Sequence, residues 1–231
     1  MPRPGDRIAR VSADGFNDAM RDPAVRAIDL ASDGSHRMLG ALDVAAARAD
    51  PKLVFGTGGT TFVHLELWRE CGLAGMHGTA GLTDAEPVVV CGDSAELRVP
   101  GRASGTLMGG CLAALRAMTG AGLPSLHGTI LLLTGERTQG LGQVDRQLTH
   151  LRRAGVLGGV RAVAVGRFAG FDGLVDRDWT LLDVLRDRLT DLGVPVLGGL
   201  PLGPGSPAVP IGTMAELDAD AGTLTVAAGV R

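Results

Sequence analysis

Short apolar runs alternate with segments of helical periodicity along the chain, and this alternation limits the fold more than any other feature. Several runs are uninterrupted valine, isoleucine or leucine stretches, which is typical of strands covered on both faces. The alternation of predicted strands and helices along the chain predicts an α/β protein. The predicted strands are 27–30, 53–55, 88–91, 130–133, 162–165, 195–197 and 224–227. The predicted helices are 36–49, 61–70, 107–118, 144–154 and 181–192.

The clearest boundary signals belong to the last helix and to one stretch without a helix. Thr180 and Asp183 have the spacing of a box that caps a helix N-terminus, and Gly193 follows the last apolar position. The segment 81–100 is rich in turn and charged residues. We therefore expect an N-terminal lobe at 1–80, a crossing at 81–100 and a C-terminal lobe at 101–231.

Composition predicts a folded protein that does not bind nucleic acid. The chain is 45% hydrophobic and 20% charged, with a net charge of −3 and aromatic residues at only 3%. Cys71, Cys91 and Cys111 lack metal-ligand spacing, so we expect a reducing cytoplasm and no metal. The first residues contain no apolar leader, and no apolar run approaches the roughly 18 residues that span a membrane.

The stretch VFGTGGTTF at 54–62 predicts a strand that turns sharply into a helix. Its glycines would let backbone N–H groups converge on an anion at the start of the helix. However, the stretch lacks the lysine of a P-loop and the final glycine of a dinucleotide-binding turn, so we expect no nucleotide cofactor. A purely structural turn remains the alternative.

Five residues with reactive or charged side chains are candidates for chemistry. Glu136 follows an apolar strand in a glycine-bearing loop, although a solvated charge would explain it too. His77 in GMHGTAG could transfer a proton or position a loop by hydrogen bonds. Asp145 and Arg146 begin a helix, where charged side chains are usually surface residues without a site role. Cys111 begins an apolar helix whose positive end could lower the pKa of its thiol, and the alternative is that Cys111 is simply buried in the core.

Taken in order, several segments resemble the LD-carboxypeptidase family of serine peptidases. These enzymes cut the L,D peptide bond of cytoplasmic muropeptides, and relatives confer immunity to microcin-type antibiotics. The resemblance covers residues 16–231 and implies a Rossmann-like N-terminal lobe with a nucleophile-elbow turn and a C-terminal α/β lobe. Between PGDRIARVSADG and FNDAM about half of the family's first lobe is missing, so the lobe is shortened. The matching segments are FNDAMRDPAVRAIDLA, PKLVFGTGGTTFVHLELWRECGLAGMHGTAG, GRASGTLMGGCLAAL, GTILLLTGERTQGLGQVDRQLTHLRRAGVL and VPVLGGLPLGPGSPAVPIGTMAELDADAGTLTV.

The resemblance also implies that the catalytic triad is absent. The family's nucleophilic serine falls at Gly58, its glutamate at Thr134 and its histidine at Pro204. None of these residues can attack, accept a proton or orient an imidazole. Losing such a triad costs on the order of a million-fold in kcat, so hydrolysis by the family mechanism should be absent.

Two hypotheses follow from the resemblance. In the first, the chain is a pseudoenzyme that binds a small peptide-like or natural-product ligand, or a partner protein, in the cleft between its lobes. In the second, it is a repurposed enzyme, such as a cyclase or isomerase in a biosynthetic pathway, with Glu136, His77 and Asp145 as candidate catalytic residues. A shortened first lobe would also expose surface, and a homodimer is the simplest cover for it. The residues expected to contact a ligand are Gly56, Thr57, Gly58, Gly59, Thr60, Thr134, Arg146 and Pro204.

Overall fold

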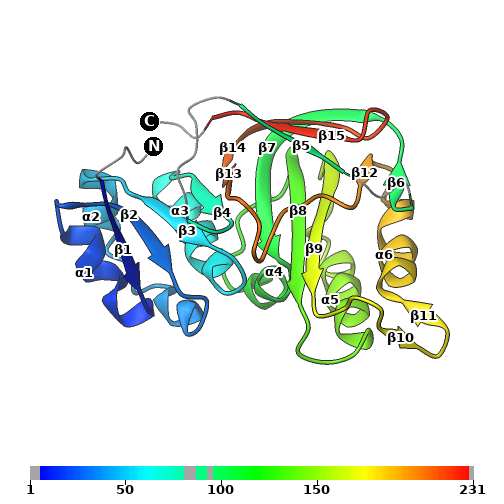
Figure 1. The fold of residues 1–231 in the computed structure, drawn as a ribbon, viewed down its shortest axis with the longest axis horizontal. Coiled ribbons are helices and arrows are strands. Elements are labelled where there is room, and N and C mark those ends of the chain that lie inside the picture. Colours follow the sequence, from blue (N-terminus) through cyan, green and yellow to red (C-terminus); the bar gives the residue numbers. More distant parts are fainter. Residues whose placement is uncertain (1–5, 81–86, 93–95, 229–231) are drawn as a thin grey trace.

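A computed structural model describes residues 6–80, 87–92 and 96–228 and contains two sheets that lie side by side (Figure 1). The first sheet has the order β1-β2-β3-β4-β13. Its first four strands run parallel, and β13 pairs antiparallel with β4. The strands are β1 (Arg7–Val11), β2 (Val25–Leu30), β3 (Leu53–Gly56), β4 (Gly75–His77) and β13 (Val209–Ile211). The helical segments around it are η1 (Ala13–Gly15), α1 (Phe16–Arg21), η2 (Ser35–Met38), α2 (Val44–Ala49) and α3 (Thr60–Cys71).

The second sheet has the order β5-β15-β14-β7-β8-β9-β12-β6. Its centre, β7-β8-β9-β12, is parallel, while β5, β15 and β14 pair antiparallel and curl over one end (Figure 1). Its strands are β5 (Val88–Cys91), β6 (Arg98–Val99), β7 (Arg102–Cys111), β8 (Thr129–Glu136), β9 (Ala162–Ala169), β12 (Val196–Leu197), β14 (Thr213–Asp218) and β15 (Thr223–Val226). The remaining elements are α4 (Leu112–Met118), α5 (Gly142–Arg153), α6 (Leu181–Leu189), η3 (Thr190–Leu192) and the hairpin of β10 (Val175–Asp176) and β11 (Trp179–Thr180).

The sequence prediction of an α/β protein is confirmed, and its errors are local. The predicted helix at 107–118 is half strand: β7 runs to Cys111, and only then does α4 begin. The predicted helix at 36–49 is two short pieces, because Gly40 has φ +72° after η2 and Asp43 caps α2 by accepting from the Ala46 N–H. The expected crossing at 81–100 contains β5 and β6, which both pair within the second sheet, while 81–86 and 93–95 lie outside the described residues.

The two sheets share buried apolar contacts. The cluster that packs α4, α5 and α6 on the second sheet also contains Leu65 of α3, which is fully buried. A separate cluster fills the first lobe between its sheet and α1, α2 and α3. The burial of Leu65 among side chains of the second lobe ties the elbow helix α3 to both halves of the molecule.

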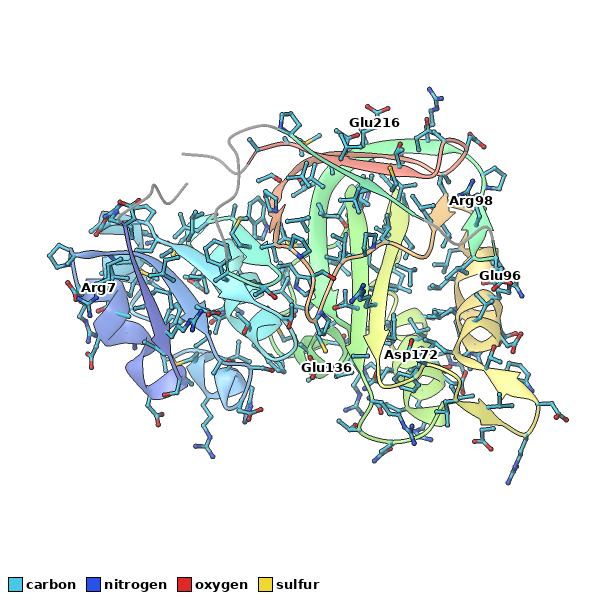
Figure 2. All side chains as sticks on the ribbon, in the orientation of Figure 1. Arg7, Glu96, Arg98, Glu136, Asp172 and Glu216 are labelled. Carbon is cyan, nitrogen blue, oxygen red and sulfur yellow. The ribbon has the colours of Figure 1, made fainter. Side chains whose placement is uncertain are left out.

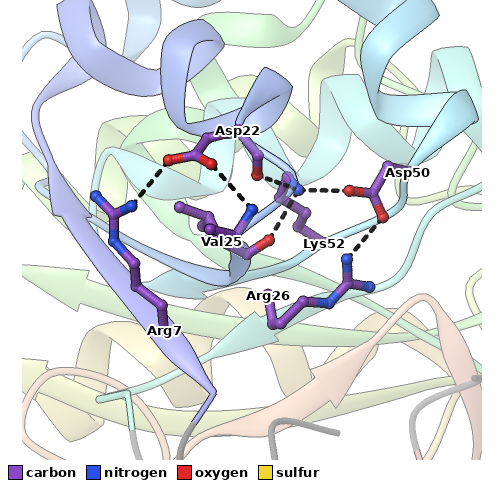
Figure 3. A network of polar contacts seen from close by, with 7 residues as sticks. Arg7, Asp22, Val25, Arg26, Asp50 and Lys52 are labelled. Carbon is purple, nitrogen blue, oxygen red and sulfur yellow. Dashed lines mark hydrogen bonds and ion pairs between the residues drawn. The ribbon is translucent and has the colours of Figure 1, made fainter.

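A buried lysine organises the polar edge of the first sheet (Figure 3). The Lys52 ammonium, whose side chain is 0% exposed, donates to the carbonyls of Asp22 and Val25 and to a carboxylate oxygen of Asp50. Arg26 pairs with the other oxygen of Asp50 at 2.8 Å. Because three acceptors surround the ammonium, a buried charge is compatible with the fold here. Lys52 precedes β3 directly, so it fixes the start of the strand that ends in the elbow.

Candidate functional site

Strand β3 passes into helix α3 through a tight turn of glycine and threonine. Gly56 has φ +151° and Gly58 φ +57°, which are conformations that side-chain-bearing residues rarely adopt. Thr60 donates its hydroxyl to the Leu30 carbonyl at 3.0 Å, so the first turn of α3 is fixed to the end of β2. The predicted sharp strand-to-helix turn is confirmed, and the special backbone conformation falls at the position that the resemblance assigns to a nucleophile.

Two oxygen atoms occupy the space in front of Gly58. A Cβ atom built there would lie 2.6 Å from the Ser32 hydroxyl and 2.9 Å from Oε1 of Glu136. The Ser32 hydroxyl also accepts the Gly59 N–H at 2.6 Å. Because both oxygens lie this close to one point, they are within about 5.5 Å of each other. The structure therefore brings the first lobe's Ser32 and the second lobe's Glu136 together at the elbow.

Glu136 ends β8 and presents a free carboxylate. The residue is exposed, and no hydrogen bond or ion pair holds its side-chain oxygens within the described part of the chain. Its carbonyl instead accepts from the Gln143 side chain at 3.1 Å, which fixes the loop backbone. Figure 2 labels Glu136 near the end of β8 where the two lobes face each other. The sequence indicates Glu136 as a site residue but not Ser32, since no motif marks a single serine in the loop after β2.

His77 and Thr134 form a buried polar pair behind the elbow. The His77 ring Nε2 and the Thr134 hydroxyl lie 3.2 Å apart and share a hydrogen bond. Burial, followed by the nearby charge of His64, lowers the pKa of His77 to about 3. Burial likewise lowers the pKa of His64 to about 4. Both rings are therefore neutral near pH 7, and His77 is a hydrogen-bonding group there rather than a cation.

Pro204 lies between the buried Thr134 and a large surface cavity, as the contacts of its loop show. A Cβ atom on the neighbouring Gly203 would lie 3.1 Å from Cγ2 of Thr134, so the proline loop packs directly on that threonine. The loop is held to β9 because the Arg167 N–H donates to the Leu202 carbonyl at 2.8 Å. Pro204 also lines a cavity of about 690 Å³ beyond the carboxyl end of β9. The positions of Thr134 and Pro204 are thus adjacent in space.

Of the other predicted site residues, Asp145 and Arg146 have partners of their own, whereas Cys111 adjoins this group and lies opposite Thr134 in the pairing of β7 with β8. Asp145 accepts from the Arg188 guanidinium at 2.6 Å, and Arg146 donates to the Gln139 side chain at 3.1 Å. Cys111 is buried, and its N–H donates to the Thr61 hydroxyl at 3.0 Å. Burial raises the pKa of the Cys111 thiol, which fits the interpretation of Cys111 as buried packing and not as a thiol activated by the helix terminus.

No set of three or more side chains that could hold a metal ion occurs in the described ranges. Likewise, none of the helices there has the length and apolar character needed to cross a membrane.

Two family models match this chain, and together they cover both lobes. Residues 8–78 match the LD-carboxypeptidase N-terminal domain, and residues 104–217 match the LD-carboxypeptidase C-terminal domain. With an elbow on the first sheet and a strand end of the second sheet facing it, the fold and site define a two-lobed α/β protein with the LD-carboxypeptidase domain arrangement. The chain belongs to the LD-carboxypeptidase family.

Individual relatives agree with this assignment. A Streptomyces coelicolor protein assigned to the carboxypeptidases is 37% identical, with 96% of this chain and 79% of the relative aligned. The alignment spans 251 positions, more than the 231 residues of this chain, so the relative has residues with no counterpart here. A Bacillus subtilis protein assigned as a murein peptide carboxypeptidase is 28% identical, with 93% of this chain and 76% of the relative aligned.

Solved structures share the fold. The muramoyltetrapeptide carboxypeptidase from Oxalobacter formigenes superposes with a TM-score of 0.77 at 25% identity, covering 93% of this chain and 81% of the other. The MccF-like protein from Bacillus anthracis gives a TM-score of 0.77 at 19% identity, covering 94% and 80%. The microcin C7 self-immunity protein MccF in complex with aspartyl sulfamoyl adenosine gives 0.72 at 20% identity, covering 93% and 79%.

Proposed function

We propose that this chain is an LD-carboxypeptidase homologue that binds a small peptide-like ligand between its lobes and does not hydrolyse it by the family mechanism. The observation that carries the proposal is Gly58 itself, which has no side chain to attack a ligand and lies in the elbow at φ +57°, beside the Ser32 hydroxyl and the Glu136 carboxylate. Thr134 and Pro204, at the other two triad positions, offer no base for a nucleophile.

The ligand class is suggested by the relatives. The Oxalobacter neighbour is named for a muramoyl tetrapeptide, and MccF structures contain aspartyl or glutamyl sulfamoyl nucleosides. Both are short peptide-like molecules. A free carboxylate on Glu136, a hydroxyl on Ser32 and a cavity beyond Pro204 would give such a ligand polar and apolar contacts on both lobes.

The test compares binding with turnover on the same samples. Purified protein is mixed with a muramoyl tetrapeptide, an aspartyl sulfamoyl nucleoside and a lysate extract, with thermal shift as the binding readout and mass spectrometry as the turnover readout. We expect a rise in Tm without release of the terminal amino acid. Release of that amino acid, abolished by Ser32→Ala or Glu136→Gln, would contradict the proposal.

A repurposed enzyme is the second candidate, favoured by the unpaired Glu136 carboxylate at the elbow. Such a group could move a proton in a cyclisation or isomerisation. Its test is conversion of compounds from the lysate extract followed by mass spectrometry. Conversion that is lost in Glu136→Gln and retained in Glu96→Gln, an exposed carboxylate on another edge, would support this candidate.

A cytoplasmic location and a homodimer remain part of the proposal. Val175 and Trp179 are 59% and 48% exposed on the hairpin, and such side chains are often covered by a partner. Sedimentation of the protein, with Trp179→Glu as the variant, would test the dimer. A monomer at all concentrations would contradict the proposed homodimer.

A further inference from the structure

The cavity next to Pro204 is lined by both apolar and charged residues. It lies beyond the carboxyl end of β9, under the hairpin of β10 and β11, and its volume is about 690 Å³. Phe168, Phe171 and Leu174 supply apolar surface. Arg167 and Asp172 supply opposite charges on the same lining. A cavity of this size holds a group much larger than a water molecule.

The two charged side chains of this cavity have no partner in the described part of the chain. Arg167 takes part in the fold only through its backbone, which donates to the Leu202 carbonyl. Asp172, labelled in Figure 2, makes no ion pair or side-chain hydrogen bond. The two residues line one cavity and still do not pair with each other. This differs from the nearby Asp145, which already pairs with Arg188.

We propose that this cavity binds a zwitterionic amino-acid group. Its carboxylate lies on the Arg167 guanidinium, its ammonium on Asp172, and its side chain against Phe168, Phe171 and Leu174. A planar guanidinium matches a carboxylate with two parallel hydrogen bonds, and a carboxylate is the complementary partner for an ammonium. The apolar wall accepts the aliphatic part of the ligand. An unpaired cation and an unpaired anion on one wall select for a ligand that bears both charges.

The inference rests on the proposed function, because Pro204 lines the cavity and another lining residue, Ala169, lies opposite Glu136 in the pairing of β8 with β9. A peptide-like ligand whose backbone lies at Gly58 and Glu136 would place one end in this cavity. The proposal thereby specifies the end of the ligand: a residue that is joined to the rest of the ligand through its side chain, so that its amino and its carboxylate group are both free.

The experiment uses three small probes and two variants. Free leucine, leucine methyl ester and N-acetylleucine are titrated into the protein, and affinity is measured by saturation-transfer NMR. We expect leucine to bind about tenfold or more tighter than either blocked form, since each loses one charge-assisted contact. Arg167→Gln should bind leucine no better than its methyl ester. Asp172→Asn should bind leucine no better than N-acetylleucine.

Matched controls are Arg153→Gln and Asp220→Asn, which change exposed residues away from the cavity and should bind leucine like the unaltered protein. The assignment is overturned if leucine and its blocked forms bind equally or not at all, or if the cavity variants behave like the controls. A muramoyl tetrapeptide that binds the cavity variants unchanged would overturn this inference and leave the proposed function intact. Absence of any ligand binding to the unaltered protein would remove both.

Discussion

Gly58 combines a left-handed backbone with two side-chain oxygens close in front of it, and a side chain at this position would have a separate cost from each. A residue with a side chain at φ +57° loses about 1 kcal/mol from backbone strain. Its Cβ would also press on Ser32 and Glu136 at 2.6 and 2.9 Å. Gly40 has φ +72° with nothing within 4 Å, so it shows the strain alone.

We therefore expect Gly58→Ser to lower the unfolding free energy by about 1 kcal/mol more than Gly40→Ser, because only the first displaces the Ser32 hydroxyl from the Gly59 N–H. Urea unfolding measures both variants. Adding Ser32→Ala to Gly58→Ser should recover part of the difference, and the added serine should not restore hydrolysis. Equal losses in the two glycine variants would show that the space in front of Gly58 is not filled as described.

The buried histidines make stability depend on pH in one direction. The folded protein keeps His64 and His77 neutral, with pKa values of about 4 and 3, whereas the unfolded chain protonates them near 6.5. Below pH 6.5 the unfolded state binds more protons, so stability falls as the pH falls toward 4. Each histidine contributes up to about 1.4 kcal/mol per pH unit.

Urea unfolding between pH 7.5 and 4.5 tests this dependence. We expect the slope of stability against pH to decrease in His64→Gln and in His77→Gln, while the exposed His150→Gln keeps the slope of the unaltered protein. An unchanged slope in His77→Gln would mean that this ring is protonated in the folded state.

Single residues also show what the sequence could and could not predict about the site. Glu136 was predicted because it follows an apolar strand in a glycine-bearing loop, Gly58 because its turn resembles a nucleophile elbow, and His77 because it lies in a glycine-rich stretch. Ser32 was not, because its contact with Gly59 joins positions 27 residues apart and depends on the packing of two loops. The pairing of His77 with Thr134 spans 57 residues and two lobes, which periodicity along one chain segment cannot encode.

At the scale of elements, local sequence signals predicted the boundaries of helices that begin with a capping residue. They failed where a segment becomes a strand through its contacts with neighbouring strands. The stretch 107–118 has enough leucine, methionine and alanine for one helix, yet its first residues lie between β8 and β14 as β7. Gly109 and Gly110 have φ of +129° and +135°, and a Cβ on Gly109 would lie 2.3 Å from the Leu132 carbonyl. Glycine allows this close approach, and its strand role is visible only once the neighbouring strand is in place.

The start of α6 is an element whose boundary the sequence did specify. The Thr180 hydroxyl accepts the Asp183 N–H, and the Asp183 carboxylate accepts the Thr180 N–H at 2.8 Å. Thr180→Ala should therefore lower stability by about 1 kcal/mol, measured by thermal and urea unfolding. Thr190→Ala, which removes only a hydroxyl that donates to the Arg186 carbonyl, should cost less. A smaller loss of stability in Thr180→Ala than in Thr190→Ala would show that the Thr180 cap does not stabilise α6.

For the whole molecule, the sequence predicted an α/β fold but not how its two sheets exchange strands. Residues 209–211 form β13 in the first sheet, and β14 in the second sheet begins at Thr213. Apolar stretches this short carry no signal for which sheet they join. The lobe bounds of 1–80 and 101–231 remain a prediction, and β13 shows that the C-terminal part of the chain completes the first sheet.

Because the two sheets exchange strands, we expect the two lobes to unfold together in one cooperative transition, and the two tryptophans can report it. The chain has two tryptophans, Trp68 on α3 in the first lobe and Trp179 on the hairpin of the second. Because β13 pairs with β4 and Leu65 is buried against the second lobe, neither lobe can unfold without exposing apolar surface of the other.

In Trp179→Phe and Trp68→Phe, which each leave one tryptophan, urea unfolding followed by fluorescence should give the same midpoint and slope. Far-UV circular dichroism of each variant controls for the substitution itself. Two separated midpoints, each reproduced by circular dichroism as a distinct step, would show that the lobes fold independently and that β13 does not couple them.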